Sequence, residues 1–327
     1  MAIEARYWDS LEDGRVLCTL CPHACLLSEG SRGLCRSRMC KDGKMELLNY
    51  GKTIAFSMDP IEKKPLYHFH PGSQILSLGP NSCNLSCSFC QNYQISQMDQ
   101  ETKYLSPEQL YRFLCEHSLK QVAFTYTEPL TWFEYIMDFA ALAKDIDIVL
   151  VTNGFLNHAP FREIMGVCRA MNIDLKSMNP EFYQSECRGK LEPVLGNIRS
   201  ASQGGVHLEI TNLLIPGLNS SSEDVQALID FCSELSEDTI LHFSAYHPAY
   251  HQDIPATPER VVMEACELAA GKLNYVYAGN VSGTNYHNTN CPVCHYPVIG
   301  RSVWQTECRW NKPGRCPNCG YYIPGVY

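Results

Sequence analysis

Three cysteines in the first third of the chain, Cys83, Cys87 and Cys90, are spaced C-x3-C-x2-C, so one short loop supplies three thiolates. A cubane iron–sulfur cluster ordinarily takes four cysteines. Three ligands would leave one iron open, and an open coordination position is where a metal site binds and activates another molecule. The alternative, a structural zinc knuckle, requires a fourth cysteine or histidine close by, and none follows within a short distance.

The end of the chain carries a second metal-ligand pattern. Two C-x2-C pairs are separated by twenty-one residues and consist of Cys291, Cys294, Cys316 and Cys319. Paired knuckles of this kind predict a zinc ribbon, with rubredoxin-like iron as the second choice. So short a tail buries too little apolar surface to fold without its metal.

A third set opens the chain and consists of Cys18, Cys21, Cys25 and Cys35. It has enough thiolates for zinc or for a second iron–sulfur cluster, and the spacing leaves both open. Zinc is the preferred interpretation, whereas a second cluster would indicate an electron relay. The isolated cysteines, such as Cys115 and Cys187, fit buried small apolar residues better than ligands.

Composition narrows the class of protein. With 327 residues, the chain can form one barrel-sized domain and small modules. It has no apolar run long enough to span a membrane and no apolar signal core near Met1. We therefore expect a cytoplasmic protein in which the 18 cysteines do not form disulfides and the clustered ones bind metal. The net charge of −9 argues against nucleic acid as the main partner.

Three regions follow from the patterns: a cysteine-rich segment over residues 1–45, an α/β region over 46–285 and the ribbon-like tail over 286–327. In the middle region, strand-like segments are predicted at Gln74–Gly79, Gln121–Tyr126, Ile146–Val151, Asn172–Leu175, His207–Ile215, Leu241–Tyr246 and Leu273–Ala278. Helical patterns lie between them, beginning at Ser106 and covering Leu130–Ala143, Phe161–Met171, Pro193–Ser202, Glu223–Glu234 and Pro258–Gly271. This alternation predicts parallel βαβ units in a partial or complete β/α barrel.

Each unusual motif falls at the end of a predicted strand. They are the cysteine loop, Glu128, Thr152 with Asn153, Asp174 with Lys176, Pro216 with Gly217, and His247. Barrel enzymes build their active sites at the carboxyl ends of the strands. We therefore expect these residues to converge on one face.

The cysteine loop, from Asn81 to Asn92 with Phe89 before its last cysteine, resembles that of radical S-adenosylmethionine (SAM) enzymes. This resemblance implies that Cys83, Cys87 and Cys90 hold a [4Fe–4S] cluster whose open iron chelates SAM, and that Phe89 flanks the adenine. An electron from the cluster would split the sulfonium into a 5′-deoxyadenosyl radical. A flavodoxin or ferredoxin is the implied electron donor.

The motifs T-N-G, D-L-K and P-G resemble those of glycyl-radical activating enzymes such as pyruvate formate-lyase activase. The resemblance implies a cofactor-binding set of Glu128, Thr152, Asn153, Asp174, Pro216 and Gly217. Glu128 would meet the SAM amino group, although the two glycines that usually precede it are missing. Lys176 and His247 are the candidate catalytic residues. Val151 replaces the aspartate that often precedes T-N-G and is linked to a cation there.

Further motifs at Cys21–Cys25, Pro65–Gly72 and Tyr275–Val281 resemble the AmmeMemoRadiSam-system radical SAM enzymes over nearly the whole chain. That resemblance implies MEMO-type and AMMECR1-type proteins as partners. The sequence thus predicts a radical SAM oxidoreductase that abstracts hydrogen from a protein or small molecule. The alternatives are a glycyl-radical activase and, in another class, a structural adaptor that binds several metals.

Overall fold

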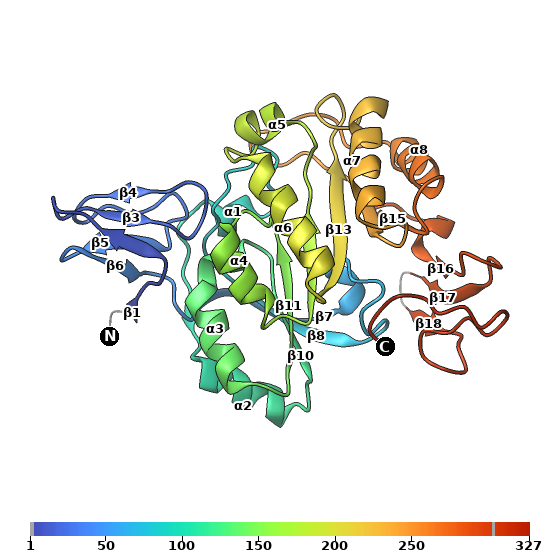
Figure 1. The fold of residues 1–327 in the computed structure, drawn as a ribbon, viewed down its shortest axis with the longest axis horizontal. Helices are drawn as coiled ribbons and strands as arrows, with labels where there is room; N and C mark the ends of the chain where they lie inside the picture. Colours follow the sequence, from blue (N-terminus) through green and yellow to red (C-terminus); the bar gives the residue numbers. More distant parts are fainter. Residues whose placement is uncertain (1–2, 303–304) are drawn as a thin grey trace.

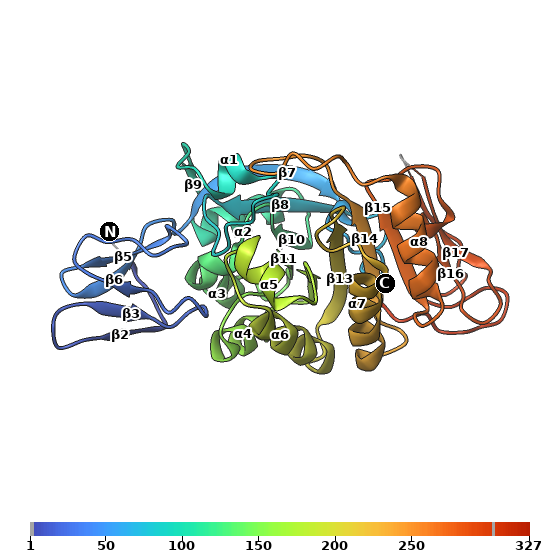
Figure 2. The ribbon, with the colours of Figure 1, turned by 90° about the horizontal axis from the view of Figure 1, so that it is seen from above.

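A central sheet with helices along its outer side makes up most of the molecule (Figures 1 and 2). The structure is a computed structural model that describes residues 3–302 and 305–327. Small antiparallel sheets lie at the two ends, the N-terminal ones in blue and the C-terminal one in red (Figure 1). No helix in the described residues is both long and apolar enough to cross a membrane.

Within the described residues the central sheet has nine strands, in the order β15-β14-β13-β12-β11-β10-β8-β7-β9. The strands from β8 to β15 in that order are all parallel. They are β8 (Gln74–Pro80), β10 (Gln121–Phe124), β11 (Asp147–Thr152), β12 (Ala170–Asp174), β13 (His207–Leu214), β14 (Ile240–Ala245) and β15 (Tyr275–Gly279). Their residues are mostly buried, as expected for parallel strands covered on both faces.

Two further strands extend the sheet beyond β8. The long strand β7 (Lys52–Pro60) pairs antiparallel with β8, and the short strand β9 (Lys103–Tyr104) pairs antiparallel with β7. In the described residues β15 and β9 are the edges of the sheet and no pairing joins them. The fold is therefore a partial barrel (Figure 2).

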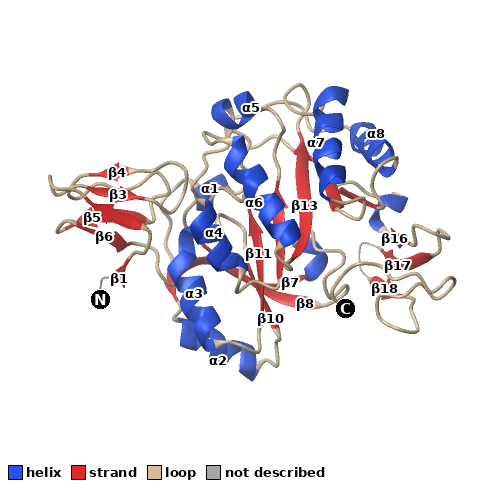
Figure 3. Ribbon diagram, viewed as in Figure 1, coloured by secondary structure: helices blue, strands red, loops and turns tan. Residues whose placement is uncertain are grey.

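The helices follow the expected alternation (Figure 3). They are α1 (Tyr93–Ser96), α2 (Pro107–Glu116), α3 (Phe133–Leu142), α4 (His158–Met165), α5 (Pro180–Ser185), α6 (Leu191–Gln203), α7 (Ser222–Leu235) and α8 (Glu259–Ala270), with 3-10 turns η1 (Ile61–Lys63), η2 (Pro129–Trp132) and η3 (Asn285–His287). Local sequence sets where they begin: at α2, Ser106 and Gln109 form a reciprocal capping box.

The N-terminal region forms two three-stranded sheets, β1-β6-β5 and β2-β3-β4. Their strands are β1 (Ile3–Glu4), β2 (Trp8–Ser10), β3 (Val16–Cys18), β4 (Leu26–Leu27), β5 (Arg38–Lys41) and β6 (Lys44–Leu47). Buried residues of these sheets, such as Val16 and Met45, join the same apolar core as the barrel. A buried ion pair of 2.6 Å between Arg38 and Glu134 of α3 links the two regions.

The C-terminal strands β16 (Thr289–Asn290), β17 (Pro297–Arg301) and β18 (Thr306–Cys308) form a third small sheet. This module shares an aromatic core with Tyr275 and Tyr277 of β15. The guanidinium of Arg301 lies 4.2 Å from the ring centre of Tyr67. His68, which is fully buried, hydrogen-bonds the carbonyl of Pro324 at 2.7 Å through Nδ1. His68 therefore serves the packing of this module.

The predicted strands agree with the observed ones to within a few residues at their ends. One helix prediction was wrong: residues 161–171 are not a single helix, because α4 ends at Met165 and the chain enters β12 at Ala170. The sequence analysis also missed β7, α5 and the small N-terminal sheets. The division into three regions at residues 45 and 285 stays a prediction.

Candidate functional site

The three loop cysteines follow β8 directly. Cys87 is buried, and Cys83 and Cys90 are half-buried. The amide of Leu85 donates to Sγ of Cys83 at 3.4 Å, and Sγ of Cys90 lies 3.3 Å from Oγ of Ser96. Polar groups thus face the sulfurs, as expected for thiolates that hold an anionic cluster.

The loop is fixed by the segment after α5. The amide of Ser86 donates to the carbonyl of Cys187 at 3.0 Å, and that of Ser88 to the carbonyl of Glu186 at 2.8 Å. The hydroxyl of Ser88 donates to the Glu186 carboxylate, and Gln252 donates to that carboxylate at 2.8 Å. Residues that are distant in the sequence thereby fix the loop that carries the candidate cysteine ligands.

Cys187 is a site residue that the sequence analysis missed, because it was interpreted as a buried apolar residue. Its side chain hydrogen-bonds Cys87, and this bond lowers the pKa of the Cys87 thiol, with the charge of Lys176 acting in the same direction. Burial raises the pKa of Cys187 itself well above its ordinary range. Cys187 therefore lies beside the candidate ligand Cys87 and favours its ionised form.

Glu128 lies where the chain turns after β10 and is 1% exposed. Its Oε1 accepts from the amide of Leu130 at 2.9 Å and from the hydroxyl of Thr152 at 2.7 Å, and its Oε2 accepts from the amide of Asn153 at 2.8 Å. Burial nevertheless raises its pKa to about 7. A cationic group beside this buried carboxyl would stabilise its ionised form.

Asn153 connects Glu128 to the cysteine loop. It follows β11 and precedes Gly154, whose φ of +67° favours glycine at this turn. Its Nδ2 donates to Oδ1 of Asn84 at 2.9 Å and points to Sγ of Cys83 at 3.8 Å. The ends of β8, β10 and β11 therefore meet in one buried network.

Asp174 and Lys176 are adjacent at the end of β12, with 3.0 Å between Nζ and the carboxylate. The carbonyl of Lys176 accepts from Nδ2 of Asn219 at 2.6 Å, which fixes the backbone. Burial opposes the charge of Lys176, but Asp174 and Cys87 outweigh it and hold the lysine pKa well above its ordinary range. Lys176 is thus a permanent cation beside the cysteine loop.

The other predicted site residues are less closely joined. Phe89 is buried against Phe182, with 5.7 Å between ring centres. Pro216 is half-buried and Gly217 exposed in the turn after β13, where Gly217 has a φ of +74°. His247 is exposed after β14 and makes no hydrogen bond to a described residue. These residues are near strand ends but outside the hydrogen-bonded network.

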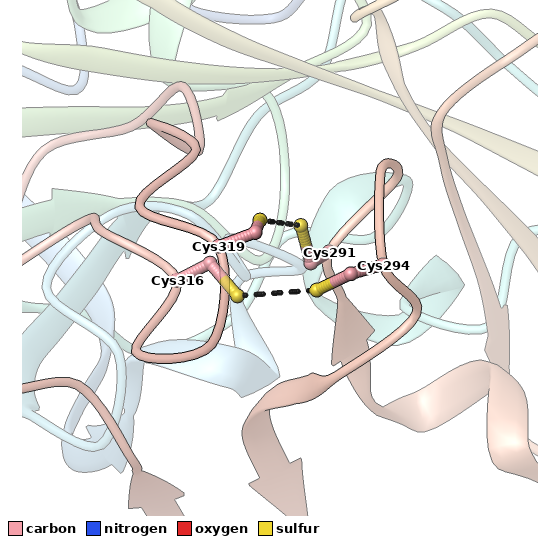
Figure 4. Close-up of side chains that lie close together, drawn as sticks. All are labelled: Cys291, Cys294, Cys316 and Cys319. Atoms are coloured by element: carbon pink, nitrogen blue, oxygen red, sulfur yellow. Dashed lines mark hydrogen bonds between the residues drawn. The ribbon is translucent and has the colours of Figure 1, made fainter.

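The C-terminal cysteines form a compact ligand group (Figure 4). In the described residues all four sulfurs of Cys291, Cys294, Cys316 and Cys319 lie within 4.8 Å of one another. Two pairs, Cys291 with Cys319 and Cys294 with Cys316, are each 3.5 Å apart. A tetrahedral ion with bonds of about 2.3 Å sets sulfurs about 3.8 Å apart, so this group could hold one metal ion.

Residues 79–232 match the family profile described as the radical SAM superfamily. The chain belongs to this superfamily of enzymes. It is 37% identical to the protein MJ0808 of Methanocaldococcus jannaschii over 98% of both chains, so the two belong to one family. The residues present fit the implied cluster, since three thiols from one loop are met by amide and hydroxyl donors and by Lys176.

One solved structure has a similar fold over about two thirds of the chain. Streptococcus suis SuiB bound to S-adenosylmethionine is similar with a TM-score of 0.50 and 15% identity, over 68% of this chain and 52% of that chain. A domain of pyruvate-formate lyase-activating enzyme from Bacteroides vulgatus is similar with a TM-score of 0.43 and 23% identity, over 49% of this chain and 98% of that chain. At these identities the likeness concerns the fold alone.

Proposed function

We propose that the protein is a radical SAM oxidoreductase that reductively cleaves SAM and abstracts hydrogen from a protein or small-molecule substrate. The supporting observation is that one residue joins three strand ends: Nδ2 of Asn153 lies 3.8 Å from Sγ of Cys83, and its backbone amide donates to Glu128. Three cysteines, a buried acid and the Asp174–Lys176 pair therefore lie at neighbouring strand ends. This combination suits a charged cofactor that carries both an ammonium and a carboxylate.

Each residue would have a separate task. Cys83, Cys87 and Cys90 would hold a [4Fe–4S] cluster, which supplies the electron that splits the bound SAM. Glu128, short of a cationic partner, would accept from the SAM amino group. Lys176, held by Asp174, would attract the SAM carboxylate. We extend the proposal to Phe89 near the adenine and His247 at the rim of the site.

Anaerobic reconstitution tests this function. With iron, sulfide, dithionite and SAM, the wild-type protein should form 5′-deoxyadenosine, and Cys83→Ala should form none. Cys115→Ala is the matched control, because Cys115 is an exposed cysteine outside the site and its loss should leave the yield unchanged. If wild type forms no 5′-deoxyadenosine and Cys83→Ala keeps the wild-type spectrum, the protein is instead a metal-binding adaptor.

The alternative within this class is a glycyl-radical activase of the pyruvate formate-lyase type. Incubation with a candidate partner enzyme, SAM and reductant, followed by electron paramagnetic resonance, separates the two: a glycyl radical on the partner supports the activase. Substrates are otherwise found by following deuterium into 5′-deoxyadenosine. No spin on any partner, together with deuterium uptake from a small molecule, excludes the activase.

The remaining proposals concern the protein partners, the electron donor, the cellular compartment and the C-terminal metal. We assign the chain to the AmmeMemoRadiSam-system enzymes, with MEMO-type and AMMECR1-type proteins as partners. A flavodoxin or ferredoxin would deliver the electron in the cytoplasm. Zinc would occupy the C-terminal cysteines, whose sulfur spacing suits a single tetrahedral ion. Pull-down with purified partners and metal analysis of the isolated protein test these assignments.

A further inference from the structure

The four N-terminal cysteines surround one small, largely enclosed cavity. Cys18 and Cys21 are buried, and Cys25 and Cys35 are half-buried. All four line the same cavity, and Leu20, Leu27 and Leu130 are among the residues that complete its lining. Four thiols around an apolar cavity form a ligand set for a metal group shielded from water.

A buried cation also lines this cavity. Arg38 is 1% exposed, and its Nη2 donates to Oε1 of Glu134 at 2.6 Å. Its Nε has no hydrogen-bond partner in the described residues. A buried guanidinium with a free donor is costly unless an acceptor completes it. Glu134 already supplies the counter-charge, so what is missing is an acceptor for Nε, and anionic sulfur, either a thiolate or a cluster sulfide, would supply it.

The spacing of the sulfurs distinguishes this set from the C-terminal one. Among the described residues, the compact group within 4.8 Å consists of the C-terminal cysteines alone. Neither the N-terminal set nor the trio Cys83, Cys87 and Cys90 forms such a group. One ion draws its thiolates together, whereas a cubane places iron atoms between them and holds them farther apart. In the described residues, neither of these two sets thus has the compact arrangement that a single ion imposes.

The N-terminal set is also joined to that loop. His23, between Cys21 and Cys25, lies with its Nε2 2.6 Å from the carbonyl oxygen of Asn84. Asn84 lines the cavity and is the covalent neighbour of Cys83. The route from one cysteine set to the other therefore crosses a single hydrogen bond through buried protein.

We propose that Cys18, Cys21, Cys25 and Cys35 hold an iron–sulfur cluster that passes single electrons to the cluster of the Cys83 loop. A flavodoxin- or ferredoxin-type donor would reduce the N-terminal cluster by one electron, and that electron would then move inward with no bond made or broken. The presence of this cluster does not depend on the proposed function. The role of this cluster as an electron relay does depend on the proposed function.

The proposal is tested by removing the ligands of the Cys83 loop and measuring the iron that the protein still binds. In the full-length triple variant Cys83→Ala, Cys87→Ala, Cys90→Ala, reconstituted anaerobically, about four irons per chain should remain with a dithionite-induced paramagnetic signal. Adding Cys21→Ala should abolish both, whereas adding Cys316→Ser instead should leave both intact. Zinc in place of iron at the N-terminal set, or no iron in a folded triple variant, would overturn the proposal.

A second measurement does not disturb the ligands. In the double variant Arg38→Gln, Glu134→Gln, the buried pair becomes neutral without leaving one charge alone. Arg38 lines the cavity and Glu134 does not, so the double variant removes a positive charge that lies nearer the cluster than the negative one. The midpoint potential of the retained signal should therefore move to a more negative value, because the reduced cluster carries more negative charge. A potential equal to that of the parent triple variant would contradict the placement of the cluster beside Arg38.

Discussion

The carboxyl of Glu128 should make stability fall as pH rises through neutrality. Its pKa in the folded protein is raised from the ordinary 4.5 to about 7, because the side chain is buried. The folded state therefore binds more protons than the unfolded state between these values, and stability declines as the carboxyl ionises. From about pH 6 to pH 8.5 this group alone should remove about 1.4 kcal/mol from the free energy of unfolding.

Glu128→Gln should remove this slope. The amide cannot ionise, so the urea-unfolding midpoint of the SAM-free variant should lose this component of its pH dependence. At pH 6 a loss of about 1–3 kcal/mol in the free energy of unfolding should accompany it, because one of the buried amide and hydroxyl donors now meets an NH₂ group. Above pH 8 this loss is partly offset, since no charge has to be buried.

The measurement needs one matched control. Glu181, in the first turn of α5, is exposed, so Glu181→Gln should retain the wild-type slope. Urea midpoints of wild type, Glu128→Gln and Glu181→Gln are compared anaerobically at several pH values in this range. Parallel profiles for wild type and Glu128→Gln would refute the reasoning, because they would show that Glu128 is ionised throughout or does not titrate differently on unfolding.

Three further predictions concern neighbouring positions. Gly79→Ala should cost about 3 kcal/mol or more by urea unfolding, because a Cβ there would lie 2.1 Å from the backbone oxygen of Thr125; a loss below about 1 kcal/mol would contradict this close approach. Cys187→Ala should keep the loop iron but shift its midpoint potential to a more negative value, since the donor to Cys87 is lost; an unchanged potential in a spin-resonance titration would count against the bond. Cys316→Ser should lower bound metal by one ion per chain and reduce thermal stability, and full retention of metal would argue against the C-terminal site.

Much of the barrel could be predicted because the local sequence of each strand is enough to identify it. Parallel strands covered on both faces read as short apolar runs, and β10 is buried at every position. The polar residues that end these runs, such as Glu128 and Asn153, were therefore visible as a set. What the sequence could not give was the contact between them, since the Asn153–Cys83 approach joins residues on different strands.

Other site features had no local signal at all. Cys187 lies alone in the sequence, and its bond to Cys87 is made only when the segment after α5 packs against the cysteine loop. Arg38 likewise gave no sign of being buried, because charged residues are almost never buried without a partner and its partner, Glu134, is 96 residues away. Local pattern identifies ligands by type, but long-range packing decides the electrostatics around them.

The N-terminal segment lies at one end of the molecule but shares its apolar core with the barrel (Figure 1). Arg38 enters the core and would leave Glu134 as an uncompensated buried acid if it were absent. His23 contacts the backbone beside Cys83, and Leu130, next to the Glu128 turn, closes the N-terminal cavity. The same few residues thus support the Glu128–Asn153 network on one side and the N-terminal thiols on the other. Only a single layer of side chains thus separates the two cysteine sets, so a change in charge at one set would alter the electrostatic potential at the other. The proposed electron relay requires this proximity.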